Sequence, residues 1–492
     1  MTEDHTPVTS PAAALTATAP SRTGPNRWRT LAVVLVGAFM ALLDVTVVNV
    51  ALPSIASGLR AGESILEWVV AGYALAFGLV LIPAGRLGDR FGHRNTFVAG
   101  LAVFTLASLA CGLSQSPLQL VIARIVQGMG AGLFQPAIAA TIQTNFTGRD
   151  RSRAFGMLGA TIGLSTALGP LLGGALVELG GPDHGWRWIF LVNVPIGLVI
   201  VPLALRLLPR PARTVPRGVD PVGLLLLSAG LVALLLPLIE GRQLGWPAWT
   251  WAGFAASVVL LGGLWAWEVR LAGRGGEPLI PVHLVRRLPF AAGCLLALVY
   301  FASFTSLFFT ISLLWQTGLG RSPLAAGLAV IPFALANMVV AGLSDRFSAR
   351  LGRRVLILGC ALMSTGLSLV LVVLHLQAPA PSAWALAGPL ALAGIGNGLF
   401  IAPNQDFVLA TVERQEAGAA SGFLSTAQRI GSSIGIAAVG TVLFGTLDAR
   451  GPADLARAFT HSAQLATVLN VGLVLLALVL VLALPKKARA GG

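Results

Sequence analysis

A single acidic residue lies near the middle of an apolar segment close to the start of the chain. Residues 30–53 are long enough to cross a bilayer as a helix, and Asp44 is their only ionisable side chain. A charge at membrane depth costs about 2.5 kcal/mol or more on insertion scales, so such a residue is by default a functional candidate. The alternative is that Asp44 stays protonated or takes part in a structural bond.

A basic partner is available at the same depth. Residues 118–146 form another apolar segment, which contains Arg124 and Gln127. At the helical rise, Asp44 lies about 13 Å from the membrane face at the end of its segment, and Arg124 and Gln127 lie about 9 to 13 Å from the same face. We expect Asp44 and Arg124 to pair directly or through water, with the carboxylate held in one conformation and released in another. A static structural pair is the alternative.

The composition indicates a polytopic membrane protein. The chain has 492 residues, of which 55% are hydrophobic and 11% charged. A mean hydropathy of +0.82 is too high for a soluble globular protein. The net charge of +14 would suggest nucleic-acid binding in a soluble chain, but the basic residues here lie in short loops between apolar segments. We therefore expect no nucleic-acid partner.

No metal site, disulfide or cofactor is expected. The three cysteines, Cys111, Cys294 and Cys360, lie far apart inside apolar segments, which is typical of small core residues. The six His residues are scattered, so no metal-binding spacing is present.

Fourteen apolar runs are candidates for membrane-spanning helices. They cover residues 30–53, 66–86, 96–115, 118–146, 155–179, 187–208, 219–240, 248–268, 290–316, 323–343, 355–376, 383–411, 418–446 and 462–484. The predicted division is a disordered cytoplasmic tail (1–29), a six-helix half (30–208), a linker with two extra helices (209–289), a second six-helix half (290–484) and a cytoplasmic tail (485–492).

The basic residues predict the orientation. Most of the 33 Lys and Arg residues fall in the two tails and in the even-numbered loops. Positive loops face the cytoplasm, so both termini are expected there. The first residues are rich in Thr, Ala, Pro and Ser and do not resemble a signal peptide.

A short loop motif recurs in the two predicted halves. Residues 84–94 (AGRLGDRFGHR) follow the second span, and residues 341–347 (AGLSDRF) follow the tenth. We expect a tight cytoplasmic turn at each place. Positive charge alone does not explain an Asp-Arg-Phe at corresponding positions, so the repeat indicates two similar halves, as in transporters built from repeats.

These features resemble the major facilitator superfamily, and more narrowly its fourteen-span drug:proton antiporter family (EmrB/QacA type). Residues 43–53 (LDVTVVNVALP) and 124–130 (RIVQGMG) are similar to two signatures of the drug exporters. The resemblance implies an all-α polytopic membrane protein with the major facilitator fold, two six-helix halves plus two inserted helices. It also implies that Asp44 and Arg124 take part in proton coupling.

Two further motifs carry the resemblance. The loop after the second span implies a gating latch between the halves, formed by Gly85, Asp89, Arg90, Gly92 and Arg94. The fifth span resembles the motif that is typical of antiporters, with Gly159, Gly163, Gly169, Pro170, Gly173 and Gly174. Glycines at this spacing let helices approach closely, and ordinary helix packing is the alternative reading.

A central substrate cavity is also expected. Phe301, Phe304 and Phe308 lie on one face of the ninth span, which lines the cavity in this fold; packing or lipid contact is the alternative. We expect apolar or cationic substrates to contact these rings. For Asp406 we favour a structural ion pair with Arg429 over a role in proton coupling. The full candidate set is Asn49, Gln127, Phe301, Phe304, Phe308, Trp315, Asn397 and Asp406.

The resemblance implies a proton-coupled antiporter that exports drugs or other small organic compounds and confers antibiotic resistance. We expect a monomer in the bacterial plasma membrane whose partners are the substrate, protons and the lipid bilayer. It is not expected to be an enzyme, because the sequence contains nothing similar to a nucleophile motif or a nucleotide site. A dedicated exporter of one metabolite or self-made antibiotic, and a proton-independent facilitator, remain the alternatives.

Overall fold

The computed structural model describes residues 26–483, apart from residues 182, 210–219, 277, 281, 410–411, 413–416, 449–450 and 452–453. Most of both predicted tails and the start of the predicted linker lie outside the described residues, and the domain boundaries stay predictions. The first group of helices comprises α1 (Arg27–Leu59), α2 (Glu63–Phe91), α3 (His93–Leu113), α4 (Pro117–Asn145), α5 (Gly148–Gly180), α6 (Gly185–Leu191) and α7 (Asn193–Leu207).

The remaining helices form a pair and a second group. The pair is α8 (Pro221–Glu240) and α9 (Ala248–Gly273), followed by the short α10 (Val282–Val285). The second group comprises α11 (Leu288–Leu313), the π-helix η2 (Leu314–Gly318), α12 (Pro323–Ala329), α13 (Ile331–Ala341), α14 (Ser344–Leu351), α15 (Arg354–Leu376), α16 (Ala383–Gly398), α17 (Ile401–Leu409), α18 (Ala417–Gly445) and α19 (Leu455–Ala483).

The number of membrane spans agrees with the prediction. Thirteen helices in the described residues are long and apolar enough to cross a membrane, and the count reaches 14 if the two parts of α5 form one span. These parts, Arg153–Ser165 and Leu168–Gly180, are bent by 41°. Pro170 lies at this bend and lacks the backbone N–H that would continue the hydrogen-bond ladder.

Three predicted spans are each divided into two helices, namely α6–α7, α12–α13 and α16–α17. The second helix of each pair has a proline within its first three residues: Pro195, Pro332 and Pro403. Proline is tolerated in the first turn of a helix, where the missing N–H has no intrahelical partner. The prolines therefore favour a new helix start at each of these places.

One of the two predicted tight turns is wrong. The first is present, because α2 ends at Phe91 and α3 begins at His93 after Gly92, which has a φ of 90°. The second contains the helix α14 instead. The residue after the second Asp-Arg-Phe is Ser348 rather than glycine, so the helix continues until Gly352, whose φ is 53°.

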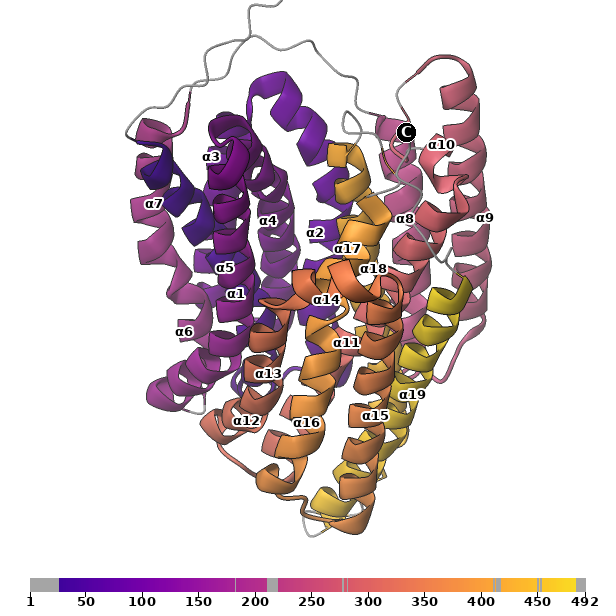
Figure 1. Cartoon of the computed structure of the whole chain (residues 1–492). Coiled ribbons are helices and arrows are strands. Elements are labelled where there is room, and N and C mark those ends of the chain that lie inside the picture. The colour runs from indigo at the N-terminus through magenta and orange to yellow at the C-terminus, as the bar shows by residue number, and fades with distance from the viewer. Residues whose placement is uncertain are drawn as a thin grey trace, which may run out of the picture.

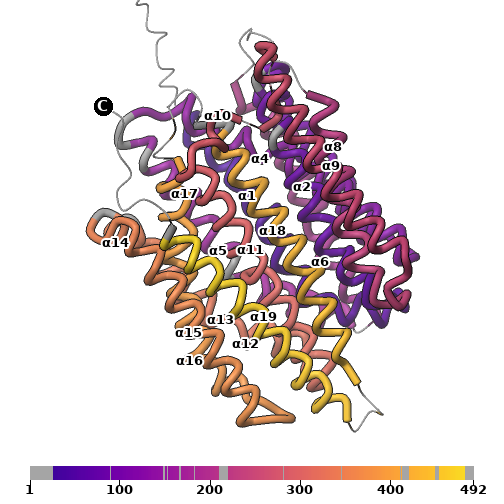
Figure 2. The backbone as a smooth tube through the Cα atoms, turned by 90° about the vertical axis from the view of Figure 1, so that its right-hand side faces the viewer, coloured from indigo at the N-terminus to yellow at the C-terminus, as the bar shows by residue number. Residues whose placement is uncertain are grey.

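The two groups lie side by side and meet along two seams (Figure 1). In one seam α2 packs against α18, and in the other α5 packs against α12 and α13. The pair α8 and α9 lies along one edge of the molecule, as Figure 2 shows. Helix α8 contacts both α2 and α18 and therefore bridges the first seam.

The described part of the chain begins and ends at the same end of the helix bundle (Figure 1). We call the end where α1 begins and α19 ends the tail face. There Thr30 Oγ1 donates to the Leu207 carbonyl at 3.0 Å, and Arg86 donates to the Pro278 carbonyl just before the second group. The other end is the opposite face, where α2 begins and Arg242 forms an ion pair with Glu63.

Candidate proton and substrate site

Asp44 and Arg124 form a buried ion pair between α1 and α4. Arg124 Nη1 lies 2.5 Å from Asp44 Oδ2, and the side chains are 0% and 2% exposed respectively. This is the contact expected from the matching depths of the two residues. Two opposite charges in such an apolar setting attract strongly, although their removal from water is also costly.

Gln127 completes the pair by bonding to both partners. Its Nε2 donates to Asp44 Oδ1 at 2.9 Å and to Ser108 Oγ at 2.8 Å, and its Oε1 accepts from Arg124 Nη1 at 2.6 Å. Gln127 lies one helical turn after Arg124 on the same face of α4. Its contacts hold the orientations of both charged groups.

Arg124 is also held from α2. Its Nε donates to the Val69 carbonyl at 3.0 Å, and its guanidinium carbon lies 4.1 Å from the centre of the Tyr73 ring. Arg124 Nη2 has no partner among the described residues. One nitrogen of the guanidinium is therefore available for a new bond when the pair rearranges.

Several members of this cluster were not predicted from the sequence. Asn193 Nδ2 lies 3.5 Å from Asp44 Oδ1 and reaches it from the first turn of α7. Ser108, Val69 and Tyr73 come from α3 and α2. Asn193 is one of few polar residues in its segment and could have been found by that signal. Val69 contributes a backbone carbonyl, which no side-chain pattern can indicate.

The opposite side of α1 contacts the second group. Ser312 Oγ of α11 donates to the Asn49 carbonyl at 2.5 Å, and Gln316 Nε2 donates to the Val50 carbonyl at 2.7 Å. In a regular helix the Asn49 carbonyl would accept from residue 53, but Pro53 has no N–H. The proline therefore leaves an acceptor for the other half of the molecule.

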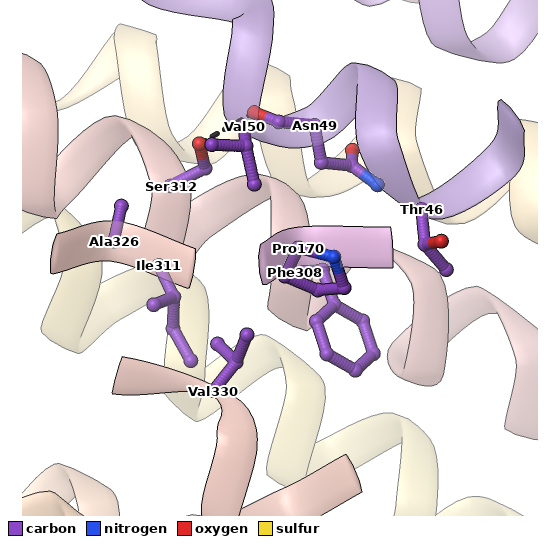
Figure 3. Close-up of a pocket in the computed structure, with 9 residues that line it drawn as sticks. All are labelled: Thr46, Asn49, Val50, Pro170, Phe308, Ile311, Ser312, Ala326 and Val330. Carbon is purple, nitrogen blue, oxygen red and sulfur yellow. Dashed lines mark hydrogen bonds between the residues drawn. The ribbon is translucent and has the colours of Figure 1, made fainter. Parts of the chain in front are cut away.

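A small pocket lies at this junction (Figure 3). Figure 3 shows Thr46 and Asn49 of α1 above Pro170 of α5 and Phe308 of α11. The remaining lining residues are Val50, Ile311, Ser312, Ala326 and Val330. Both helix groups thus contribute to one site in the middle of the bundle, and two predicted cavity residues, Asn49 and Phe308, line it.

The glycine motif of α5 packs in two directions. Gly169 and Gly173 face α1: a Cβ on Gly169 would collide with Thr46, and a Cβ on Gly173 would lie 3.0 Å from the Val47 carbonyl oxygen. Gly174 faces α12, where a Cβ would lie 2.7 Å from Leu324 Cα. Pro170 contacts Gly327 of the same helix. The motif therefore brings α5 close to both groups at once.

The packing of the motif opens toward the tail face, at Gly159. A Cβ on Gly163 would lie 3.3 Å from Met338, and one on Gly159 would meet no atom within 4 Å. Gly85 of α2 and Gly422 of α18 are equally open. Among these glycines of the described residues, the contacts between the groups are therefore closest at Gly174, toward the opposite face, and are absent at Gly159, Gly85 and Gly422.

The aromatic stripe of α11 is present. Phe301 and Phe304 have ring centroids 5.7 Å apart, and those of Phe304 and Phe308 are 5.4 Å apart. Trp315 is buried in η2. Asn397 is buried in a polar network, in which it accepts from Tyr300 Oη at 3.1 Å and donates to Asn337 at 2.9 Å. Asn397 is thus held by two side chains of the second group, and its role in a substrate cavity stays a prediction.

Asp406 and Arg429 are placed differently from Asp44 and Arg124. Asp406 is exposed on α17, whereas the guanidinium of Arg429 lies 4.3 Å from the centre of the Phe77 ring on α2. The ion pair expected between them is not formed in the described part of the protein, because the guanidinium of Arg429 is directed at the other helix group. A buried acid was also overlooked: Glu67, near the start of α2, is 1% exposed and its Oε2 has no partner among the described residues.

The candidate latch lies at the tail face. Arg94 donates to the Leu205 carbonyl, and the guanidinium of Arg90 lies 5.1 Å from the centre of the Phe91 ring. The side chain of Asp89 lies outside the described residues. Gly85 and Gly92 belong to the end of α2 and to the turn after it. The latch function of these residues stays a prediction.

Comparison with known proteins supports the same fold. The chain is 37% identical over 431 residues to the probable actinorhodin transporter of Streptomyces coelicolor, a match that covers 87% of this chain and 75% of that protein. It is 34% identical to the multidrug resistance protein Stp of Mycobacterium tuberculosis, over 87% of this chain and 78% of that one. The crystal structure of the POT family transporter PepTSo aligns with a TM-score of 0.67 at 15% identity and covers 94% of this chain and 99% of that one.

The family follows from these matches. The family model described as Major Facilitator Superfamily matches residues 34–436 and 293–490, which together cover most of the chain. The matched region contains the Asp44–Arg124 pair and the helices of both groups. The chain therefore belongs to the Major Facilitator Superfamily of transporters.

Proposed function

We propose that the protein is a proton-coupled antiporter that exports small organic compounds, antibiotics among them, from the cytoplasm of a bacterium. The observation that carries this proposal is the position of Asp44. Its carboxylate pairs with Arg124 inside the first group, while the same helix contacts the second group one to two turns later, at Asn49 and Val50. A change at Asp44 can thus be transmitted to the contact between the groups.

The proposed orientation places the tail face in the cytoplasm. The excess of Arg in the tails and in the even-numbered loops supports it through the positive-inside rule. With this orientation, the close contacts at the opposite face close the transporter toward the outside. The described conformation is then one that faces the cytoplasm, ready to accept a compound to be exported.

The proton acts on the ion pair. When a proton from the outer side binds a carboxylate oxygen of Asp44, the negative charge disappears and the bond to Arg124 weakens. Arg124 keeps its bonds to the Gln127 amide oxygen and the Val69 carbonyl. Helix α1 is then free to shift relative to α4. In this scheme the protonated state returns from facing outward to facing inward, and the proton leaves to the cytoplasm.

Transport in inside-out vesicles tests this function. The wild-type protein should accumulate a labelled antibiotic when a proton gradient is imposed, and Asp44→Asn should abolish the dependence on the gradient. Asp150→Asn is the matched control, because Asp150 forms an exposed pair with Arg27 at 2.8 Å near the tail face. Gradient-driven efflux that survives Asp44→Asn unchanged would rule out the role of Asp44.

A dedicated exporter of one compound is the second candidate. The relative named for a single compound, actinorhodin, supports it, whereas the relative named for multidrug resistance supports broad specificity. A susceptibility panel of dyes and several antibiotic classes, on cells with and without the gene, separates the two. Protection against one class alone indicates the dedicated exporter.

A further inference from the structure

We infer that Arg429 is an anion-binding point for the exported compound, so that organic anions with an apolar or aromatic body are the preferred substrates. The inference deepens the proposed export function and rests on it. It is carried by an arginine in the middle of the bundle whose side chain, in the described part of the protein, forms no hydrogen bond or ion pair.

Arg429 lies near the centre of the bilayer. It is about 18 Å from the start of α18 at the helical rise, and the hydrocarbon core is about 30 Å thick. An arginine at this depth is costly unless it faces a water-filled cavity or a partner of opposite charge. Arg429 is half-buried, so the described residues leave part of it uncovered.

The position of Arg429 against the first group is fixed. On either side of it along α18, Thr426 Oγ1 donates to the Gly78 carbonyl and Ser433 Oγ donates to the Ala71 carbonyl, both at 3.0 Å. A Cβ on Gly78 would lie 2.9 Å from Arg429 Cβ, so the two helices touch at this point. The guanidinium then covers the Phe77 ring.

In the described part of the chain, the guanidinium of Arg429 lacks the polar partners that Arg124 has. Tyr73 and Phe77 lie one turn apart on α2, and an arginine guanidinium packs on each ring. The guanidinium carbon lies 4.1 Å from the ring centre for Arg124 on Tyr73 and 4.3 Å for Arg429 on Phe77. Arg124 has Asp44, Gln127 and a carbonyl as partners. The Arg429 side chain has no hydrogen-bond or ion-pair partner among the described residues. The N–H groups of its guanidinium are therefore available to a ligand.

None of three acidic residues that could serve as partners pairs with Arg429 in the described part of the protein. Asp44 is held by Arg124. Glu67 is about 15 Å from Phe77 along α2 at the helical rise, toward the opposite face. Asp406 is exposed on α17 and has interactions of its own. An anionic group brought by the substrate would therefore meet an uncompensated guanidinium.

The chemistry of the ligand follows from the guanidinium. Arginine binds carboxylate and sulfonate groups through two parallel hydrogen bonds, which a point charge cannot match. The body of the ligand would extend toward the apolar side chains between the groups. A cationic compound at the same place would be repelled. An anionic ligand at Arg429 differs from the apolar or cationic substrates that the aromatic stripe of α11 predicts.

Binding to the purified full-length protein tests the inference without a gradient. The probes are fluorescein, which is anionic, and rhodamine 123, which has a similar ring system but is cationic. We expect fluorescein to bind the wild type more tightly than rhodamine 123 does. Arg429→Gln should weaken fluorescein binding about 10- to 100-fold, because a hydrogen-bonded charge pair is lost, and should leave rhodamine binding unchanged or stronger. Arg429→Lys should fall between the two.

Each other outcome counts against the inference. A wild type that binds rhodamine 123 but not fluorescein, or neither, has no anion-binding point of this kind. Equal losses for both dyes in Arg429→Gln, with a lower thermal midpoint, would give Arg429 a structural role only. Gln428→Ala, on the neighbouring residue, is the control for general damage to α18. If proton-driven export fails while fluorescein binding follows this pattern, only the proposed function is wrong.

Discussion

The Asp44–Arg124 pair provides a sharp test of the energetics. Replacing one partner leaves the other charge buried, because the two side chains are 2% and 0% exposed. Breaking a buried ion pair in this way costs about 3–5 kcal/mol of folding free energy. We expect the low end, about 3 kcal/mol, for Asp44→Asn and for Arg124→Gln, because Gln127 keeps hydrogen bonds to the remaining partner in either variant.

The double variant should behave differently. With both charges removed, the amides can bond to each other and to Gln127, so Asp44→Asn/Arg124→Gln should be no less stable than either single variant. Thermal unfolding of the detergent-purified protein, followed by Trp fluorescence, measures the order of the midpoints. The pair of Arg27 and Asp150, with side chains 26% and 41% exposed, is the control, and its cycle should give a coupling of about 0–1 kcal/mol. Additive losses at the buried pair would refute the reasoning.

Three further predictions concern helix packing. Gly169→Ala should lower the thermal midpoint and impair transport, because its Cβ would collide with α1. The Cβ of Gly159→Ala meets no atom within 4 Å, so this variant should be neutral or stabilising by up to about 1 kcal/mol. Equal effects of the two variants would contradict the packing. Pro53→Ala should restore an intrahelical donor for the Asn49 carbonyl and so weaken its hydrogen bond from Ser312 of α11. Distances between spin labels on the two groups at the opposite face should then increase. Unchanged distances would show that this hydrogen bond does not hold the groups together. Glu67→Gln should raise the thermal midpoint, because Glu67 is 1% exposed with an unpartnered oxygen, and a lower midpoint would show that its charge is stabilising.

The sequence predicted those parts of the site that depend on position along one helix. Asp44 and Arg124 could be matched because depth follows from residue number at a constant rise. The aromatic stripe from Phe301 to Phe308 follows from helical periodicity in the same way. The number of spans follows from the length of apolar runs.

Contacts that depend on the rotation and packing of helices were not predictable. The expected partner of Arg429 was an acid across the hairpin, but its guanidinium points at Phe77 on the other helix group, a neighbour that only the seam between α2 and α18 creates. Glu67 was overlooked because it lies one turn inside the start of α2, where an acid usually reaches water. Its burial comes from Gly440 of α18, where a Cβ would lie 2.6 Å from the Glu67 carboxyl carbon.

The position of α8 has a consequence for how the molecule can move. The indole of Trp68 on α2 donates to Glu240 at the end of α8 at 3.0 Å, and Thr441 of α18 donates to the Leu238 carbonyl at 2.9 Å. Helix α8 thus connects α2 of the first group to α18 of the second group near the opposite face. If the two groups separate at the opposite face, we expect them to pivot about the side of α8, with the largest displacement where α5 meets α12. In that case the pair α8 and α9 would set the axis of the motion from the edge of the molecule (Figure 2).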